Sequence, residues 1–158
     1  MIINFETGEI LELPGDDLIS SNLRDLQLHR AIFDGLNVSG ADFTGSHLRN
    51  ASFNYSLSNR VVMRGVALMN ATFIGAELKE ADLSDVVAIG ADFSEADLSM
   101  SDLQGADIGS ACFEKTNLCG VNLAVKRIDE AVFFNATYDD KTIWPEGFNP
   151  ESHGAIKV

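Results

Sequence analysis

The chain has 158 residues, 46% of them hydrophobic, and a formal net charge of −13 at pH 7. This length predicts a single domain, and the hydrophobic fraction argues against an intrinsically disordered chain. The acidic balance argues against direct binding to nucleic acid or to anionic lipid, because both demand a basic surface.

The composition also bears on the compartment. The first residues, Met1–Glu6, lack a positively charged segment followed by an apolar one, so we expect no signal peptide. No stretch approaches the roughly eighteen consecutive apolar residues of a transmembrane helix, so we expect no membrane span. Two cysteines are too few for a disulfide framework and fit a reducing compartment. We therefore expect a cytoplasmic protein.

Residues 1–18 are predicted to form an N-terminal β-hairpin. Two apolar-rich segments, Ile2–Phe5 and Glu9–Leu13, are separated by Glu6–Gly8 and ended by Pro14–Gly15. A repeat protein needs a cover over its first end, where apolar side chains and strand edges would otherwise be exposed, and this hairpin could supply one. A flexible N-terminal extension is the alternative.

A five-residue pattern follows over residues 19–139 and is clearest from Ala91 to Ser110. Its central positions run in steps of five from Leu23 to Tyr138, and only two of the 24 lack a bulky apolar residue. Two positions earlier, alanine occurs in 12 of the 24 blocks. Alternation along an extended backbone places these two positions on the same side, so we expect both to point inward and their neighbours outward.

The last position of each block predicts a turn. Glycine lies two residues after the central position in eight blocks, and asparagine lies there in three. Both residues tolerate a positive φ, so we expect the chain to turn once in every five residues. A helix is disfavoured, because a period of five matches neither 3.6 nor 3.5 residues and the glycines would be costly.

Phenylalanine sets a longer period. Six of them recur every twenty residues, each two positions after an alanine: Phe33, Phe53, Phe73, Phe93, Phe113 and Phe133. This spacing predicts four blocks in each circuit, a square cross-section and six circuits. The rings should stack in a column along one inner wall. Circuits joined by strand-type hydrogen bonds should lie about 4.8 Å apart.

Two blocks depart from the pattern at the central position, where Ser58 and Ala88 replace a bulky residue. The pattern resumes after each, so we expect no insertion at either point. Around Ala88, four apolar residues of two successive circuits should point outward; we name them the apolar patch, and they are Ala67, Met69, Val87 and Ile89. An exposed apolar patch often marks an interface. Local variation without function explains the patch equally well.

Acidic residues concentrate between positions 76 and 120, where ten of them, including Glu114, accompany only Lys79 and Lys115. Because they fall at positions of several walls, we expect them to surround the rod. We name nine of them the acidic belt: Glu77, Glu80, Asp82, Asp85, Asp92, Glu95, Asp97, Asp102 and Asp107. The belt is a candidate interaction surface. A merely solvated polar exterior is the alternative, because polar residues must cover any inward-facing core.

The sequence gives little support to catalysis. His29 and His47 fall at outward positions of one wall, and His153 is distant from both in sequence, so the three do not form a ligand spacing. Cys112 and Cys119 should point outward from neighbouring walls, which predicts neither a disulfide nor a metal site. No nucleophile with a base and an orienting acid can be assigned. We expect no enzyme activity, no cofactor and no metal.

The pattern seen in Ala81-Asp82-Leu83 and in Ala41-Asp42-Phe43 resembles the pentapeptide repeat family over residues 19–139. The resemblance implies an all-β fold, a right-handed quadrilateral β-helix. The tail from Thr142 to Pro150 also resembles endings of bacterial, notably cyanobacterial, members. Within residues 140–158 we expect Trp144 and Phe148 to cover the last circuit, in preference to a partner-binding tail.

These features together predict a non-enzymatic protein-interaction or scaffold module that is a monomer or a weak homodimer, with another protein as its partner. Some members of the family confer quinolone resistance by binding DNA gyrase in imitation of duplex DNA. The resemblance therefore implies an alternative, a DNA-mimicking binder of a gyrase-type topoisomerase. This chain departs from those relatives, because we expect neither a projecting loop that breaks the pattern nor a long amphipathic C-terminal segment.

Overall fold

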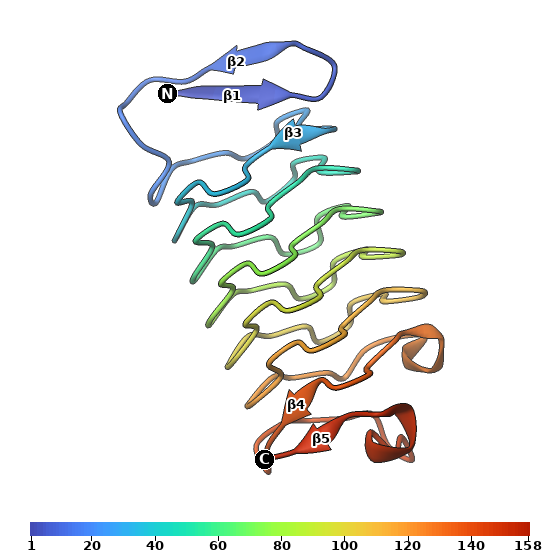
Figure 1. The fold of residues 1–158 in the computed structure, drawn as a ribbon. Coiled ribbons are helices and arrows are strands. Elements are labelled where there is room, and N and C mark those ends of the chain that lie inside the picture. The colour runs from blue at the N-terminus through green and yellow to red at the C-terminus, as the bar shows by residue number, and fades with distance from the viewer.

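The computed structural model describes all 158 residues, which form a rod with the two chain ends at its opposite ends (Figure 1). Most residues lie outside regular strands and helices. The regular elements are β1 (Ile2–Phe5), β2 (Ile10–Glu12), β3 (Ala31–Ile32), the 3-10 helix η1 (Ile128–Glu130), β4 (Thr137–Tyr138), the 3-10 helix η2 (Glu151–His153) and β5 (Ile156–Lys157). No helix is both long and apolar enough to cross a membrane.

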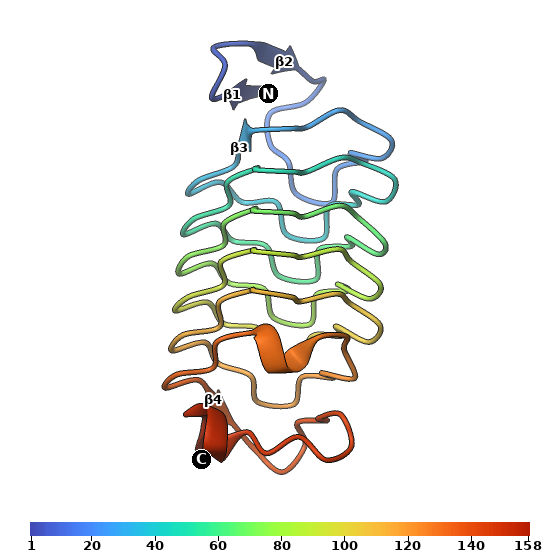
Figure 2. The same ribbon diagram turned by 90° about the vertical axis from the view of Figure 1, so that its right-hand side faces the viewer.

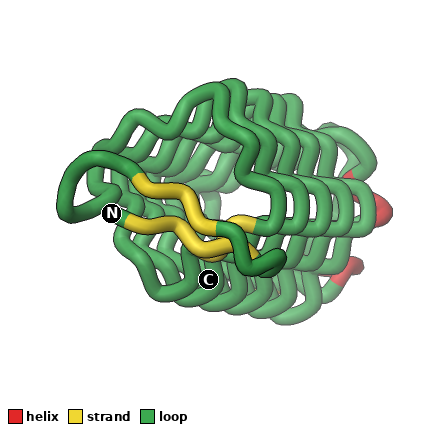
Figure 3. Tube along the Cα trace, turned by 90° about the horizontal axis from the view of Figure 1, so that it is seen from above, coloured by secondary structure: helices red, strands yellow, loops and turns green.

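Parallel β-bridges join residues that are twenty positions apart and hold the rod together. Asn22 pairs with Asp42, and the same ladder continues through Val62, Asp82 and Asp102. Backbone hydrogen bonds follow these bridges along the rod. One circuit therefore takes twenty residues, as the phenylalanine spacing predicts. Seen along the rod, successive circuits lie nearly over one another (Figure 3).

Each circuit bends where the sequence pattern places a turn. Gly35 and Gly40 have φ angles of 67° and 70°, and most fifth positions share this left-handed conformation. The predicted glycine and asparagine turns are confirmed, but other residue types also adopt them. Glu80 and Glu95 have φ angles of 57° and 61°. A side chain in this conformation costs about 1–2 kcal/mol, so the ladder of hydrogen bonds must hold these corners in place.

The predicted phenylalanine column is present and completely buried. Neighbouring rings are stacked with their planes within 10° of each other, at centroid distances that rise from 4.5 Å at one end to 5.3 Å at the other. The small residues two positions earlier are buried as well. The core is therefore one continuous apolar column filled from all sides of the circuit.

Ser58 is buried within this column. Its hydroxyl oxygen lies 2.7 Å from that of Ser56, so the two side chains satisfy each other in the interior. Phe43 belongs to the same circuit and packs edge-on against Phe33 and Phe53, at 5.5 and 5.7 Å. We infer that the ring of Phe43 fills the volume that a leucine at position 58 would otherwise occupy.

The two ends of the rod differ from the repeat. The predicted hairpin is confirmed, because β1 pairs antiparallel with β2, and β1 also pairs antiparallel with β3 of the first circuit. It lies across the end of the rod (Figure 3). At the other end β5 pairs in parallel with β4, and the ring of Trp144 packs against Phe133 and Tyr138, at 5.5 and 5.4 Å.

One prediction is wrong near this end. An uninterrupted pattern with no projecting loop is expected from the sequence, but Lys126 pairs with Asp107, nineteen residues away instead of twenty. The next residues form η1, which lies on the side of the rod that faces the viewer in Figure 2. The twenty-residue pairing returns with Cys112 and Val132.

A tight turn explains this shift. The amide of Val125 donates to the carbonyl of Leu123, only two residues earlier, at 2.7 Å. The block is therefore one residue shorter than the others, and η1 accommodates the extra residue before the next bridge. Arg127 at the start of η1 has a φ angle of 54°, so the chain reverses there without a glycine. The sequence spacing cannot reveal that one block is shorter by one residue and the next block longer by one, because the two changes cancel.

Candidate interaction surfaces

The rod presents four outward faces. We name each face after the core residue that lies behind it in the fourth circuit: the Leu83, Ala88, Phe93 and Leu98 faces. On each face, the residues just before and just after the core position point outward, and the bridges align them in ladders along the rod. A side chain on a face therefore has a fixed neighbour twenty residues before and after it. The surfaces available for binding are therefore these outward ladders and the two ends of the rod.

The apolar patch lies on the Ala88 face, in two successive circuits. Val87 bridges Ala67, and the amide of Asn70 donates to the carbonyl of Ile89 at 3.0 Å. All four patch residues are half-buried, whereas Ala88 behind them is fully buried. The structure thus brings the four predicted residues together at the surface and exposes part of each side chain.

Polar side chains flank the apolar patch along the rod. On the N-terminal side the rings of His29 and His47 are stacked at 5.6 Å, so the two histidines predicted on one wall are indeed neighbours. On the C-terminal side Asp107 accepts a hydrogen bond from Nε of Arg127 at 2.7 Å. An apolar centre with a polar border is the usual arrangement of a protein interface.

Sequence reasoning did not anticipate Arg127 on this face. Its guanidinium group lies directly over Gly109, where any Cβ would collide with it. It also approaches the carboxylate of Glu130 at 3.6 Å. Gly109 is the only one of the thirteen glycines whose φ is not positive, so no turn requires a glycine there. Its position was the available signal in the sequence that another group approaches the backbone there.

The acidic belt is spread over all four faces. Asp82, Asp85 and Asp102 belong to the Leu83 face, Asp107 to the Ala88 face, Asp92 and Glu95 to the Phe93 face, and Glu77, Glu80 and Asp97 to the Leu98 face. Only two bridged pairs join one belt carboxylate to another, Asp82 with Asp102 and Glu77 with Asp97. No face therefore carries belt carboxylates in more than two successive circuits.

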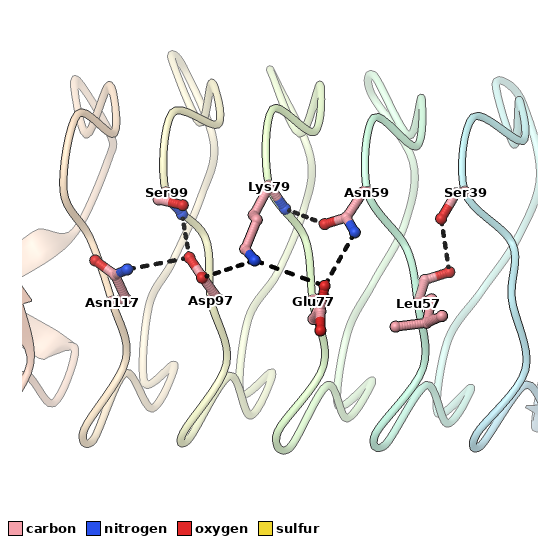
Figure 4. Close-up of polar contacts among 8 residues, drawn as sticks. All are labelled: Ser39, Leu57, Asn59, Glu77, Lys79, Asp97, Ser99 and Asn117. Atoms are coloured by element: carbon pink, nitrogen blue, oxygen red, sulfur yellow. Dashed lines mark hydrogen bonds and ion pairs between the residues drawn. The ribbon is translucent and has the colours of Figure 1, made fainter.

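Several belt carboxylates are bound by side chains of the chain itself. On the Leu98 face, Nζ of Lys79 lies 3.7 Å from Glu77 and 3.5 Å from Asp97 (Figure 4). The side-chain amides of Asn59 and Asn117 donate to the same two carboxylates, at 3.1 and 3.2 Å. On this face the belt forms a hydrogen-bonded network rather than a row of free charges.

The Leu83 face contains a shallow hollow of about 320 Å³ that is polar throughout. Asp82 accepts hydrogen bonds from the amide and the hydroxyl of Ser84, and Nε of Arg64 lies 3.9 Å from Asp85. Its lining residues are Arg64, Asp82, Ser84, Asp85, Asp102 and Gln104. These contacts orient the carboxylates along the surface and supply neither a nucleophile nor a base positioned beside one.

The two cysteines are free and half-buried. Burial raises the pKa of the Cys119 thiol, and the nearby charges of Asp139 and Asp97 raise it further. A thiol held protonated in this way is a poor nucleophile and a poor metal ligand. Cys112 lies on a different face from Cys119, the Phe93 face. There its Sγ is 3.2 Å from the hydroxyl of Ser94. No group of three or more histidine, cysteine or acidic side chains is placed to hold a metal ion.

Comparison with known protein families identifies the same five-residue repeat. The family model of pentapeptide repeats matches eight copies, in segments that together run from residue 17 to residue 124. A search of curated proteins gave no significant match.

Among solved structures, HetL of the cyanobacterium Nostoc sp. strain PCC 7120, a pentapeptide repeat protein involved in heterocyst differentiation regulation, is 21% identical over 89% of this chain and 71% of its own, with a TM-score of 0.45. QnrB1, a plasmid-mediated fluoroquinolone resistance protein, is 16% identical over 89% and 84%, with a TM-score of 0.46. A thylakoid-lumen protein of Arabidopsis thaliana is 31% identical over 64% and 67%, with a TM-score of 0.22.

Proposed function

Because the chain belongs to the pentapeptide repeat family, we propose that its outward ladders carry the function and that it is a non-enzymatic protein-interaction or scaffold module. The apolar patch on the Ala88 face is the observation that supports this proposal most. A hydrogen-bonded backbone holds its four side chains at fixed positions, so binding would order little of the protein. The partner would be another protein.

The flanks of the apolar patch suit such a partner. The stacked histidines and the Arg127–Asp107 pair give the patch a polar border, which orients a partner without adding much affinity. The acidic net charge disfavours nucleic acid and anionic membranes as partners. We propose that the protein is a monomer or a weak homodimer. Its two unpaired cysteines favour a cytoplasmic location.

The test replaces one patch residue by a charge. Ile89→Glu should abolish capture of the partner from an extract of the native organism, measured by quantitative mass spectrometry against the unmodified protein. Ile74→Glu is the matched control, because Ile74 has the same outward position and half-burial on the Phe93 face. Equal capture by both variants, with equal thermal unfolding, would refute the Ala88 face as the interface.

The gyrase-directed DNA mimic is a weaker second proposal. The net charge of −13 supports it, since a basic groove built for phosphates would attract the rod. The layout of the belt supports it less, because neighbouring lysine and asparagine side chains neutralise or bind its carboxylates on the Leu98 face. A supercoiling assay tests it directly: micromolar protein should inhibit gyrase, and an absence of any effect would remove this proposal.

We also propose a right-handed rod of six four-sided circuits, whose two ends are closed by residues 1–18 and 140–158. The handedness follows from the family resemblance. The pairing of β1 with β3 and the packing of Trp144 on Phe133 support the closing role of the two ends. Deletion of residues 140–158 should lower the unfolding temperature and cause aggregation. An unchanged unfolding temperature would instead favour a partner-binding tail.

A further inference from the structure

A cleft of about 240 Å³ opens near the C-terminal end of the rod. It is lined by Ile128, Asp129, Pro145, Glu146, Gly147 and Phe148. One side comes from η1, where the pairing is shifted by one residue, and the other comes from the loop that follows the last bridge, between Asn122 and Ile143. Both sides are departures from the repeat, so no other circuit has an equivalent cleft.

The lining combines apolar surface with one carboxylate from each side. Ile128, Pro145 and Phe148 supply the apolar contacts, and Asp129 and Glu146 supply the charges. The side chain of Asp129 is 85% exposed, and its one ion-pair contact is with the ring of His153, whose Nε2 lies 3.9 Å from the carboxylate. Unlike the belt carboxylates bound by Lys79, neither carboxylate has a lysine or arginine partner within the chain.

The loop on the far side is held firmly by aromatic packing. The ring of Phe148 lies 5.3 Å from Trp144 and 4.4 Å from His153, and it meets Phe133 at 5.7 Å. These contacts tie the loop to the end of the phenylalanine column. The cleft is therefore largely formed before any ligand binds, which reduces the entropy lost on binding.

The size of the cleft limits its ligand. Sites for drug-sized molecules usually measure about 300–1,000 Å³, so a volume of about 240 Å³ is small for one. It suits a single long side chain. Lysine and arginine lay an aliphatic stem on apolar surface while the charged head stays in contact with water and carboxylates. From these observations we propose that the cleft binds a lysine or arginine side chain of a partner polypeptide.

The overall field favours the same ligand. The chain carries a net charge of −13, so a basic peptide is attracted from a distance and an acidic one is repelled. A divalent cation held by the two carboxylates alone would make no use of Ile128 or Phe148. The site lies apart from the apolar patch, and it stands whether or not the patch is an interface.

A peptide titration tests the proposal with the whole protein. The probe is acetyl-Gly-Lys-Gly-amide, the matched control replaces lysine by uncharged norleucine, and a third peptide carries arginine. Nitrogen-15 NMR should show saturable shifts at Ile128, Gly147 and the indole of Trp144, the only tryptophan. The lysine or arginine peptide should produce them, and norleucine should not. Equal shifts with norleucine, or shifts only with added calcium or magnesium, would overturn the proposal.

Charge-removing variants locate the site. Asp129→Asn and Glu146→Gln should each weaken peptide binding about two- to fivefold, as expected for one exposed ion pair, and the double variant should weaken it further. Glu6→Gln is the control, because Glu6 is an exposed residue at the opposite end of the rod, between β1 and β2, and lies outside the acidic belt. Its affinity should stay within experimental error of the unmodified protein. If Glu6→Gln weakened binding as much as Glu146→Gln, non-specific attraction would replace the cleft as the explanation.

Discussion

The middle of the rod and its C-terminal end show two ways of using the same short repeat. Every bridge with both partners in residues 61–120 spans twenty residues, and Phe73, Phe93 and Phe113 are stacked with nearly parallel rings. The bridges that reach residues 121–158 span nineteen to twenty-one residues. There the ring of Trp144 stands at 80° to that of Phe133. In the middle the same pairing and ring packing recur in every circuit, whereas at the end several pairing and packing arrangements occur only once.

This contrast explains where each kind of surface lies. In the middle the backbone path is the same in each circuit, so one part of a face differs from another only in its side chains. The apolar patch is such a difference. At the end the backbone itself departs from the repeat, and a cleft forms between η1 and the loop at Gly147. Uniform faces favour broad contact with a partner, and the irregular end favours a confined ligand.

The largest expected effect comes from the regular column. Phe93→Ala should lower the free energy of unfolding by about 3–5 kcal/mol, because it removes a fully buried ring and leaves a cavity. Phe134→Ala is the matched comparison, since that ring points outward and is 57% exposed. It should cost well under half as much. Denaturant unfolding of both variants measures the difference, and equal losses would contradict the inward-facing column.

A smaller effect is expected at Ser58, the one central position of the repeat that holds a serine. Ser58→Leu should destabilise the protein by about 1–3 kcal/mol through overpacking beside Phe43. The double variant Phe43→Leu, Ser58→Leu should recover most of that loss, because it restores the leucines found in other circuits. Chemical denaturation gives the coupling between the two sites. Strictly additive effects would show that Phe43 does not fill the space left by Ser58.

The C-terminal end should respond to acid. Burial raises the pKa of Asp139, but hydrogen bonds from the amides of Gly120 and Lys141 and from Thr142 outweigh it and lower the pKa overall. A depressed pKa stabilises the fold above about pH 4, the value of an unfolded aspartate, and this contribution is lost as the pH falls through the folded pKa. Asp139→Asn should therefore lower the unfolding temperature at pH 7.

At an acid pH below the folded pKa the same variant should differ less from the unmodified protein, since the carboxyl group is then protonated in both the folded and the unfolded chain. Thermal unfolding at the two pH values measures this convergence. A difference that stays constant with pH would mean that the Asp139 charge does not stabilise the end. The convergence is more informative than the loss of stability at pH 7, because an asparagine at position 139 can still accept some of these hydrogen bonds.

The smallest effect is expected on the Leu98 face. Lys79→Met removes both ion pairs with Glu77 and Asp97, but all three side chains are at least partly exposed to solvent. The loss in stability should stay within about 1 kcal/mol and should shrink at high salt. Urea unfolding at low and high salt checks it. A loss like that of Phe93→Ala would show that the outer ladders hold the rod together.

Much of the fold follows from the sequence, because its rule is local. The alternation that buries Phe93 and exposes Asp92 acts within five residues, and the twenty-residue period follows from the phenylalanines alone. The place of the apolar patch follows from the same alternation. The one-residue shift at Lys126 and the contact of Arg127 with Gly109 depend on a tight turn and a long side chain. The repeat pattern contains no information on the shift, and the only signal of the contact in the sequence is Gly109, a glycine outside the turn positions.

The candidate sites were predictable to a lesser degree. The sequence places Glu77 and Asp97 in neighbouring circuits, but it does not reveal that Lys79 contacts both carboxylates. Those contacts depend on the conformations of outward side chains. The C-terminal cleft was out of reach as well, because it needs the relative positions of η1 and the loop at Pro145.

The division of the chain into inward positions that hold the rod and outward positions that carry its surfaces has one direct test. Ala88 and Ile89 are neighbours in sequence, but Ala88 is fully buried and Ile89 lies partly exposed on the apolar patch. Thermal unfolding of Ala88→Glu and Ile89→Glu should show a rod that no longer folds cooperatively in the first case. In the second the unfolding temperature should stay within a few degrees of the unmodified protein. Equal destabilisation of the two variants would contradict the account.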